Sequence, residues 1–273
     1  MEQHPETVAD KWRATLKKDG AYAHHASSYK ECKKLGKLSW TWRKVFRAIG
    51  IDPATRREFS VFEFGSGGGK HLLMFALQGW RCVGIDCSED VLDRARDFTR
   101  EVSACSGKRL NIEFICSDFV DYIHKWPLFD FVYHVGAIEH FLEDGPRLEV
   151  LRKMFNLTKP GGFVVSIVPS GVQTYRRRMR DENLGGYLIP EIDYSPELMR
   201  KEFEACGGKT VAVIPHNLFA YLLWPMKGSK PLKTFLKRTF YYLFQLVPAA
   251  IIPEAFAFRH AITLIGIARK PDA

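Results

Sequence analysis

From Phe59 onward, short apolar runs alternate with stretches of helical periodicity, and this alternation constrains the fold more than any other feature. Buried strands separated by helices are typical of βαβ units and predict a parallel sheet covered by helices. The strands are expected at Phe59–Phe64, Arg81–Ile85, Asn111–Cys116, Phe129–Val135, Gly162–Val168, Thr210–Pro215 and Ala261–Ala268.

Helices are expected between these strands and before the first of them. One helix should run from Ser27 to Ile49, closed by Gly50 ahead of Pro53. The others are expected at Lys70–Gln78, Ser88–Ser103 and Asp144–Thr158, and from Ser195-Pro196 onward. We expect one domain, in which residues 1–50 form a helical cap, 51–216 the core, 217–258 an insertion, and 259–273 the last strand and tail.

The first expected strand runs directly into a glycine-rich turn, in the sequence VFEFGSGGGK. Glycine permits a positive φ and lets a ligand approach the backbone closely. The dinucleotide fingerprint G-x-G-x-x-G fails here because its third glycine would fall on Lys70 or Leu72. A P-loop fails because His71, and not Ser or Thr, follows Gly69-Lys70. The turn alone therefore indicates either a tight connection or a site for another ligand.

The turn does match E-x-G-x-G-x-G, and it resembles motif I of the class I S-adenosylmethionine-dependent methyltransferases. The resemblance continues in chain order through VGIDCS, FICSDFVD, the type 11-like FDFVYHVGAIEHF, and LRKMFNLTKPGGFVVSIVP. It implies an α/β fold of the Rossmann-like type: a doubly wound, seven-stranded, mostly parallel sheet with an antiparallel last strand. N-terminal helices and a helical insertion before the last strand should cover the acceptor side.

The resemblance also implies the cofactor, S-adenosyl-L-methionine, with S-adenosyl-L-homocysteine as product. A carboxylate at the carboxyl end of a strand faces the crevice where such sheets bind ligands. By the resemblance, Asp86 meets the ribose hydroxyls and Asp118 the adenine amino group, with Phe119 beside the ring; helix capping is the alternative role for both acids. The expected cofactor-binding residues are Glu63, Gly65, Ser66, Gly67, Gly69, Asp86, Cys87, Asp118, Phe119 and Val135.

Methyl transfer from a sulfonium is an in-line displacement, so the enzyme mainly aligns the acceptor and removes its proton. His140 and His134 are the candidate bases, although His140 also fits a structural role at the head of a helix and His134 equally fits a place in a core layer. His24 could close over the site from the N-terminal side, whereas His71 is expected to be a first-turn helix residue. The acceptor should meet Tyr22, His25, Glu139, Arg176 and Arg178. No metal is predicted, because the Glu-His pair alone forms no convincing motif.

The net charge of +9 comes from 40 Lys and Arg against 31 Asp and Glu. One basic cluster, Arg176–Arg180, suits either a solvated loop or an anionic acceptor. The other lies in residues 228–247, where Leu232, Phe235, Leu236, Thr239, Leu243 and Leu246 recur at helical spacing with most cations off that stripe. This pattern suits a helix on a membrane surface and, equally, a lid over the acceptor pocket.

We predict methylation of a small-molecule acceptor at oxygen, with a lipid-linked, glycan or secondary-metabolite acceptor fitting the basic, apolar insertion best. An RNA or protein methyltransferase is one alternative, and a membrane-associated protein that keeps the fold without turnover is another. No nucleic-acid partner is expected, because no nucleic-acid-binding module is visible. Acidic residues near the N-terminus and six cysteines without a CxxC pair predict a cytoplasmic protein, with membrane contact limited to its surface.

Overall fold

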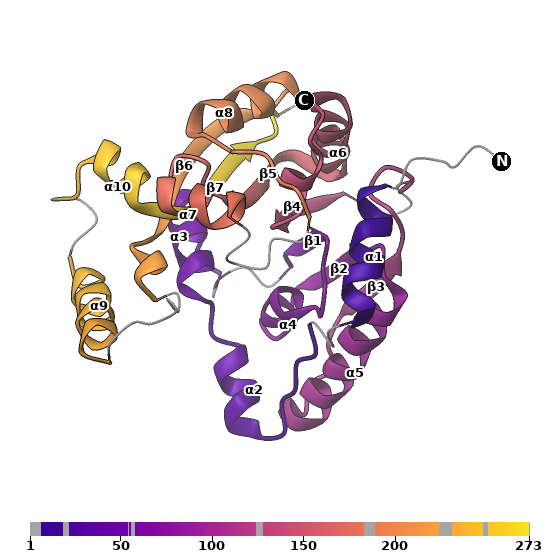
Figure 1. Cartoon of the computed structure of the whole chain (residues 1–273). Helices are drawn as coiled ribbons and strands as arrows, with labels where there is room; N and C mark the ends of the chain where they lie inside the picture. Colours follow the sequence, from indigo (N-terminus) through magenta and orange to yellow (C-terminus); the bar gives the residue numbers. More distant parts are fainter. Residues whose placement is uncertain are drawn as a thin grey trace.

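A computed structural model describes residues 7–18, 22–53, 55, 58–123, 128–182, 189–223, 231–247 and 251–272. The described residues form one seven-stranded sheet in the order β3-β2-β1-β4-β5-β7-β6 (Figure 1). All neighbouring pairs from β3 to β5 are parallel, and β7 is antiparallel to both β5 and β6. The strands are β1 (Ser60–Phe64), β2 (Arg81–Asp86), β3 (Ile112–Cys116), β4 (Phe129–Val135), β5 (Thr158–Pro169), β6 (Lys209–Leu218) and β7 (Ala261–Arg269). The predicted mostly parallel sheet with an antiparallel last strand is confirmed.

The helices cover both faces of the sheet because side chains alternate along each strand. Val61 contributes to the apolar cluster under α3 and α4, whereas Phe62 and Phe64 contribute to the cluster under α6 and α8. The helices are α1 (Val8–Lys18), α2 (Tyr29–Leu35), α3 (Trp40–Ala48), α4 (Lys70–Ala76), α5 (Glu89–Ser106), η1 (Ile138–His140), α6 (Asp144–Leu157), α7 (Thr174–Asp181), α8 (Pro196–Ala205), η2 (Ala220–Leu223), α9 (Pro231–Phe244) and α10 (Glu254–His260).

The single helix expected at Ser27–Ile49 is wrong, because the chain forms α2 and α3 there with a break between them. Gly36 ends α2, and the Ser39 side chain accepts a hydrogen bond from the Trp42 backbone N–H as the N-cap of α3. The break lets α2 pack on α5 while α3 turns toward the sheet and buries Trp42 completely. Periodicity alone did not separate the two helices, since both carry the same basic and aromatic composition.

The strand order reverses between β1 and β4, because the chain first builds outward to β3 and then returns to the other side of β1. In open α/β sheets, the connections diverge at such a point and leave a crevice beyond the carboxyl ends of the strands. The glycine-rich turn after β1 and Gly136 after β4 both lie at this edge. The topology therefore places the sequence motifs around one crevice.

The insertion lies at the opposite edge of the sheet, beside β6 (Figure 1). It begins with η2 and includes α9 and α10, which lead back into β7. Within the described ranges, no helix is long and apolar enough to cross a membrane.

Candidate cofactor and acceptor site

A cavity of about 320 Å³ lies at the carboxyl ends of β1, β2 and β4. Its volume is at the lower end of the range of small-molecule sites, about 300–1,000 Å³. The structure brings most of the expected cofactor-binding residues to its wall: Glu63, Gly65, Ser66, Gly67, Asp86, Cys87, Phe119 and Val135. Gly69 and Asp118 belong to the same edge of the sheet but do not line the cavity.

The glycine-rich turn depends on left-handed backbone geometry. Gly65, Gly67 and Gly69 have φ values of 69°, 50° and 72°, which residues with a side chain rarely adopt. A Cβ at Gly65 would come 3.2 Å from the Phe119 ring, and one at Gly67 would come 3.0 Å from the Tyr22 ring. The glycines therefore serve both the turn itself and the close approach of the groups that cover it.

Two buried carboxylates face the cavity. Asp86 accepts hydrogen bonds from the backbone N–H groups of Gly67 and Ser88, both at 3.0 Å. Glu63 accepts one from the Tyr133 hydroxyl at 3.0 Å. Burial raises the pKa of Asp86 above its usual value, although these backbone donors oppose the shift. Burial raises the pKa of Glu63 well above its usual value. Negative charge in this cavity is costly until a cation or further donors arrive.

Phe119 forms the wall opposite the glycine-rich turn, with its ring centroid 5.4 Å from that of Phe64. Asp118 accepts a hydrogen bond from the Val120 backbone N–H at 2.9 Å, so in this structure its side chain caps the local turn.

The N-terminal segment covers the cavity, and this cover includes residues that sequence reasoning missed. Trp12 of α1 lines the cavity and contacts the His140 ring edge-on at 5.1 Å. The Arg13 side chain donates to the Cys87 carbonyl at 2.9 Å and so holds α1 against the end of β2. No motif marks Trp12, because its contribution depends on where α1 docks.

Tyr22 and His24 follow in the same cover and lie directly over the glycine-rich turn. A Cβ at Gly68 would come 2.9 Å from the His24 ring, so this glycine permits the contact. Burial lowers the pKa of His24 and raises that of Tyr22. His25, the residue expected at the acceptor, instead points to Glu101 and does not line the cavity. Of these two neighbouring histidines, His24 lines the cavity and His25 does not.

His71 lies in the first turn of α4, as expected, and it also lines the cavity. Its Nδ1 accepts a hydrogen bond from the Trp42 indole N–H at 3.1 Å. Burial lowers the pKa of His71 to about 4, so the ring is neutral at pH 7. With Nδ1 accepting, the ring proton is on Nε2, and His71 is therefore a donor rather than a base.

His134, the second candidate base, does not line the cavity, and the structure places it in a core layer. Its side chain is fully buried inside the sheet, and neither ring nitrogen has a hydrogen-bond partner among the described residues. Burial lowers its pKa to about 3. The residue sits in β4 before its carboxyl end, where the strand is covered on both faces.

His140 and Glu139 form η1, next to the cavity but not on its wall. His140 shares a hydrogen bond of 2.9 Å between Nδ1 and the Pro190 carbonyl, which fits the structural role weighed for it. Glu139 is buried, with Oε2 lacking a partner among the described residues, and burial raises its pKa to about 8. Together with Glu191, these residues place three potential metal-ligand atoms within 4.8 Å of one another.

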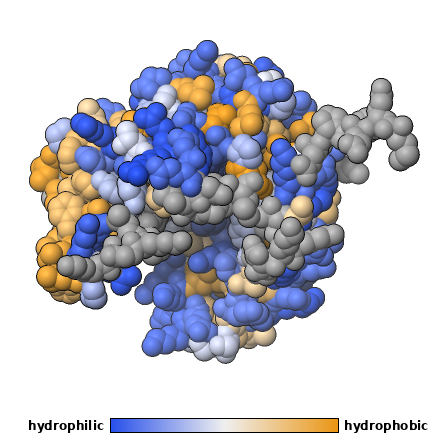
Figure 2. Space-filling model, in the orientation of Figure 1, coloured by the Kyte–Doolittle hydropathy of each residue, from blue (hydrophilic) through white to orange (hydrophobic). Residues whose placement is uncertain are grey.

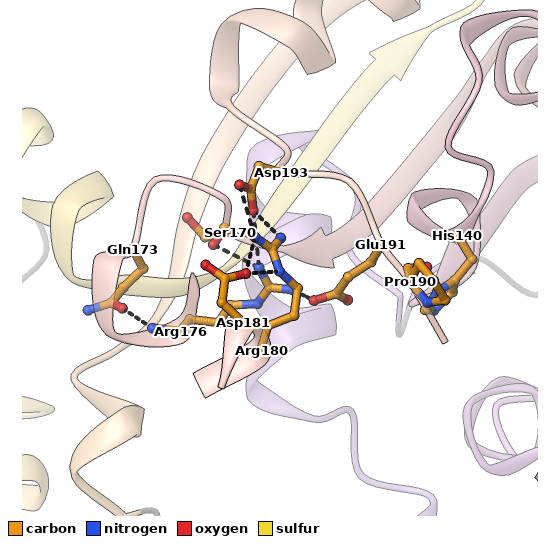
Figure 3. A network of polar contacts seen from close by, with 9 residues as sticks. All are labelled: His140, Ser170, Gln173, Arg176, Arg180, Asp181, Pro190, Glu191 and Asp193. Atoms are coloured by element: carbon orange, nitrogen blue, oxygen red, sulfur yellow. Dashed lines mark hydrogen bonds and ion pairs between the residues drawn. The ribbon is translucent and has the colours of Figure 1, made fainter. Parts of the chain in front are cut away.

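The Arg176–Arg180 cluster is largely engaged in protein contacts (Figure 3). Arg176 is 2% exposed and forms a buried ion pair with Glu191, so the expected contact with an anionic acceptor is wrong for this residue. Its guanidinium already supplies the positive charge beside the Glu139–His140–Glu191 group. Arg178 is exposed and pairs with Glu182, away from the cavity.

Comparison with known proteins finds one family match and many structures of the same fold. Residues 61–162 match the family model of a methyltransferase domain. No curated protein sequence matches the chain. The structure resembles a chain of the complex between the Haloferax volcanii Trm112 methyltransferase activator and its methyltransferase, at 16% identity, 98% and 99% coverage of the two chains, and a TM-score of 0.57.

Two further structures share the fold. An S-adenosylmethionine-dependent methyltransferase from Listeria monocytogenes has 15% identity, coverage of 85% of this chain and 98% of that one, and a TM-score of 0.54. The [4+2]-cyclase SpnF has 16% identity, coverage of 87% and 84%, and a TM-score of 0.53. Residues 61–162 thus match a methyltransferase domain, and the chain has the fold of class I S-adenosylmethionine-dependent methyltransferases; with the motif order, these findings support an enzyme of that kind.

The residues present fit the cofactor. The cavity combines a backbone cradle of glycines with two acids for a ligand that carries positive charge and hydroxyl groups. Ser66 adds a buried hydroxyl without a partner among the described residues. Such an orphan oxygen is normally satisfied by a ligand or water.

Proposed function

We propose that this enzyme transfers a methyl group to oxygen on a small-molecule acceptor bound beneath the N-terminal cover. The observation that carries the proposal is that Trp12, Tyr22 and His24 lie over a cavity of about 320 Å³, a volume that suits a small ligand better than a polymer. The lipid-linked, glycan and secondary-metabolite acceptors remain the proposed classes.

We assign the cofactor contacts to the wall of the cavity. The remaining acceptor capacity of Asp86 suits the ribose hydroxyls, because each carboxylate oxygen has more than one lone pair. Glu63, at the base of the turn, suits a positively charged ligand group, since a cation would restore the ionised state that burial disfavours. The bound cofactor supplies an activated methyl group, and the protein residues position it.

We assign the role of general base to His24. Its pKa is lowered by burial and by the nearby Lys70, so the imidazole is neutral at pH 7 and can accept the acceptor's hydroxyl proton. Neither His134 nor His71 suits this role, since the first is sealed in the sheet and the second presents a donor.

Paired histidine variants test this assignment. Removal of a general base typically lowers the rate about 10²–10⁴-fold, so His24→Ala should lower kcat by at least about 100-fold with S-adenosylhomocysteine affinity unchanged. His25→Ala is the matched control, because the neighbouring ring points away from the cavity, and it should retain most of the activity. Equal losses in both variants would exclude His24 as the specific base.

The acceptor class is tested by the fate of a radiolabelled methyl group. Cell extract and labelled S-adenosylmethionine should give label in small molecules that resist ribonuclease and protease. Label that precipitates with acid and is released by ribonuclease or protease would instead establish the RNA or protein alternative. Since one protein with this fold is a [4+2]-cyclase, transfer must be measured as well as cofactor binding. Binding without transfer to any fraction would contradict the proposed function.

A further inference from the structure

The insertion presents an apolar surface that the cavity does not use. Helix α9 has no buried residue, and five of its large apolar side chains are more than half exposed. They are Leu232, Phe235, Leu236, Tyr242 and Leu243, and Leu246 in the turn that follows is 78% exposed. Figure 2 shows hydrophobic surface over the α9–α10 region at the left of the molecule. The apolar stripe expected from the sequence thus faces solvent.

The opposite face of α9 attaches the helix to the body. Phe244 packs edge-on against Phe219, with ring centroids 4.6 Å apart, and Tyr241 joins the same apolar cluster. The Gln245 side-chain amide donates to the Leu218 carbonyl at 3.4 Å. With the inner face anchored in this way, the stripe cannot turn inward without breaking these contacts. A lid packed over the acceptor by its apolar stripe is therefore not the arrangement seen.

Positive charge borders the stripe. At about 100° per residue, Lys233 and Arg238 fall on opposite sides of the apolar face, and both are exposed. Residues 217–253 contain five Lys and Arg and no Asp or Glu. An apolar face edged by cations, without acids, is complementary to the interface of an anionic bilayer.

The surface continues toward α3. Leu246 also lines a cavity of about 820 Å³ between the end of α9 and α3, with Lys44 and Arg47 on its α3 side. Trp40, on the same wall, is 49% exposed, and its ring has the Arg43 guanidinium at 5.3 Å and the Lys44 ammonium at 5.5 Å. Tryptophan beside basic residues is typical of side chains at a membrane–water interface.

A second copy of the chain is a poorer occupant for this surface. Pairing two identical stripes around a two-fold axis would bring Lys233 and Arg238 toward the same cations of the other copy. Like charges across an interface oppose association, whereas anionic headgroups would neutralise them.

We propose that the outer face of α9 is a docking surface for anionic lipid bilayers, which holds the enzyme on a membrane with its apolar side chains in the interfacial layer. No helix in the described residues spans a membrane, so the contact is one-sided. The docking surface is separate from the cofactor cavity, and cofactor binding therefore does not depend on it.

Vesicle sedimentation tests the proposal with two probes: phosphatidylcholine alone, and phosphatidylcholine mixed with phosphatidylglycerol. The wild-type protein should pellet with the mixed vesicles at low salt, bind the neutral vesicles at least about tenfold more weakly, and be released by high salt. The variant pair Leu236→Glu/Leu243→Glu should lose about tenfold or more of this binding, as should Lys233→Glu/Arg238→Glu.

Control variants place single substitutions of the same two kinds elsewhere. Ile123→Glu alters an isoleucine that is 76% exposed, and Lys201→Glu reverses an exposed charge on α8; both should bind vesicles like wild type. Every variant should bind S-adenosylhomocysteine normally, which shows that it is folded. Failure of wild type to bind the mixed vesicles, or binding that survives both α9 variants, would overturn the proposal. A dimer in sedimentation velocity that Leu236→Glu/Leu243→Glu dissolves would also overturn it, since the face would then bind another copy.

Discussion

Two basic stretches that look alike in the sequence, α7 and α9, adopt opposite arrangements in the structure. In α7, Arg176 is 2% exposed and paired with Glu191. In α9, Lys233 and Arg238 remain at the surface beside exposed apolar side chains. The first was a candidate for contact with an anionic acceptor and the second for a membrane surface or a lid over the acceptor, yet neither lines the cofactor cavity.

The difference lies in the supply of acids. Burial of a cation removes its hydration, and this cost must be offset by an ion pair or hydrogen bonds. The segment after α7 provides such partners, because Glu191 pairs with Arg176 and Asp193 pairs with Arg180. The insertion around α9 has no acid before Glu254, and Lys233 and Arg238 stay exposed to water. Charge density therefore does not tell whether a basic cluster binds a ligand, a membrane or its own protein.

The largest expected effect concerns the buried ion pair of Arg176 in α7. Arg176→Met should lower the free energy of unfolding by about 3–5 kcal/mol, because it leaves the Glu191 carboxylate buried without its partner. Urea denaturation provides the measurement. Arg178→Met, in the exposed ion pair of the same helix, should leave the free energy of unfolding unchanged within the error of the measurement. Similar small changes in both would show that the Arg176 pair does not support the fold.

The next effect concerns the acids that face the cavity. Asp86→Ala should weaken S-adenosylhomocysteine binding about 100-fold, since a hydrogen bond to a charged group is worth about 1.5–3 kcal/mol and more than one is lost. Calorimetric titration measures the affinity, and vesicle binding should stay unchanged because α9 lies at the other edge of the sheet. Asp90→Ala, an exposed acid on α5, serves as the control. Unchanged affinity in Asp86→Ala would remove this residue from the cofactor site.

A smaller, pH-dependent effect comes from His134, a buried polar group without a charged partner. Its folded-state pKa of about 3 lies below its usual value of 6.5, so its contribution to stability is present above pH 6.5 and is lost as the pH falls toward 3. His134→Leu and His134→Gln should both flatten the decline of thermal stability over this range. The same flattening in both variants would assign the effect to the loss of a titrating group, because leucine and glutamine pack differently. An unchanged dependence of thermal stability on pH would contradict the assignment of this decline to His134.

The smallest effect is expected on the outer face of α9. Leu236→Ser should change the free energy of unfolding by no more than about 0.5 kcal/mol, since the side chain is already exposed. Phe244→Ala, on the inner face, should cost about 1–2 kcal/mol because it removes the contact with Phe219. Chemical denaturation compares the two. A larger loss for Leu236→Ser would mean that the outer face is covered in solution.

Local signals were sufficient for much of the fold and the cofactor site. The expected β4, Phe129–Val135, agrees residue for residue, and Glu63, Asp86 and the glycine-rich turn meet at one cavity. These features can be recognised from short sequence motifs, because a strand, the turn after it and the next helix are contiguous in the sequence. The break between α2 and α3 was missed, since a short loop between two helices of similar composition changes the periodicity little.

The sequence by itself predicted where the strands lie, the glycine-rich turn after β1, and the acids Glu63 and Asp86, because each depends on spacing within a short contiguous stretch. Only the tertiary structure decided which histidines reach the cavity, that Arg176 forms an ion pair with Glu191, and that the apolar stripe of α9 faces solvent. Those outcomes depend on contacts between segments far apart in the chain. The free energy that stabilises these contacts comes from the burial of side chains and from ion pairs, and a local sequence pattern specifies neither.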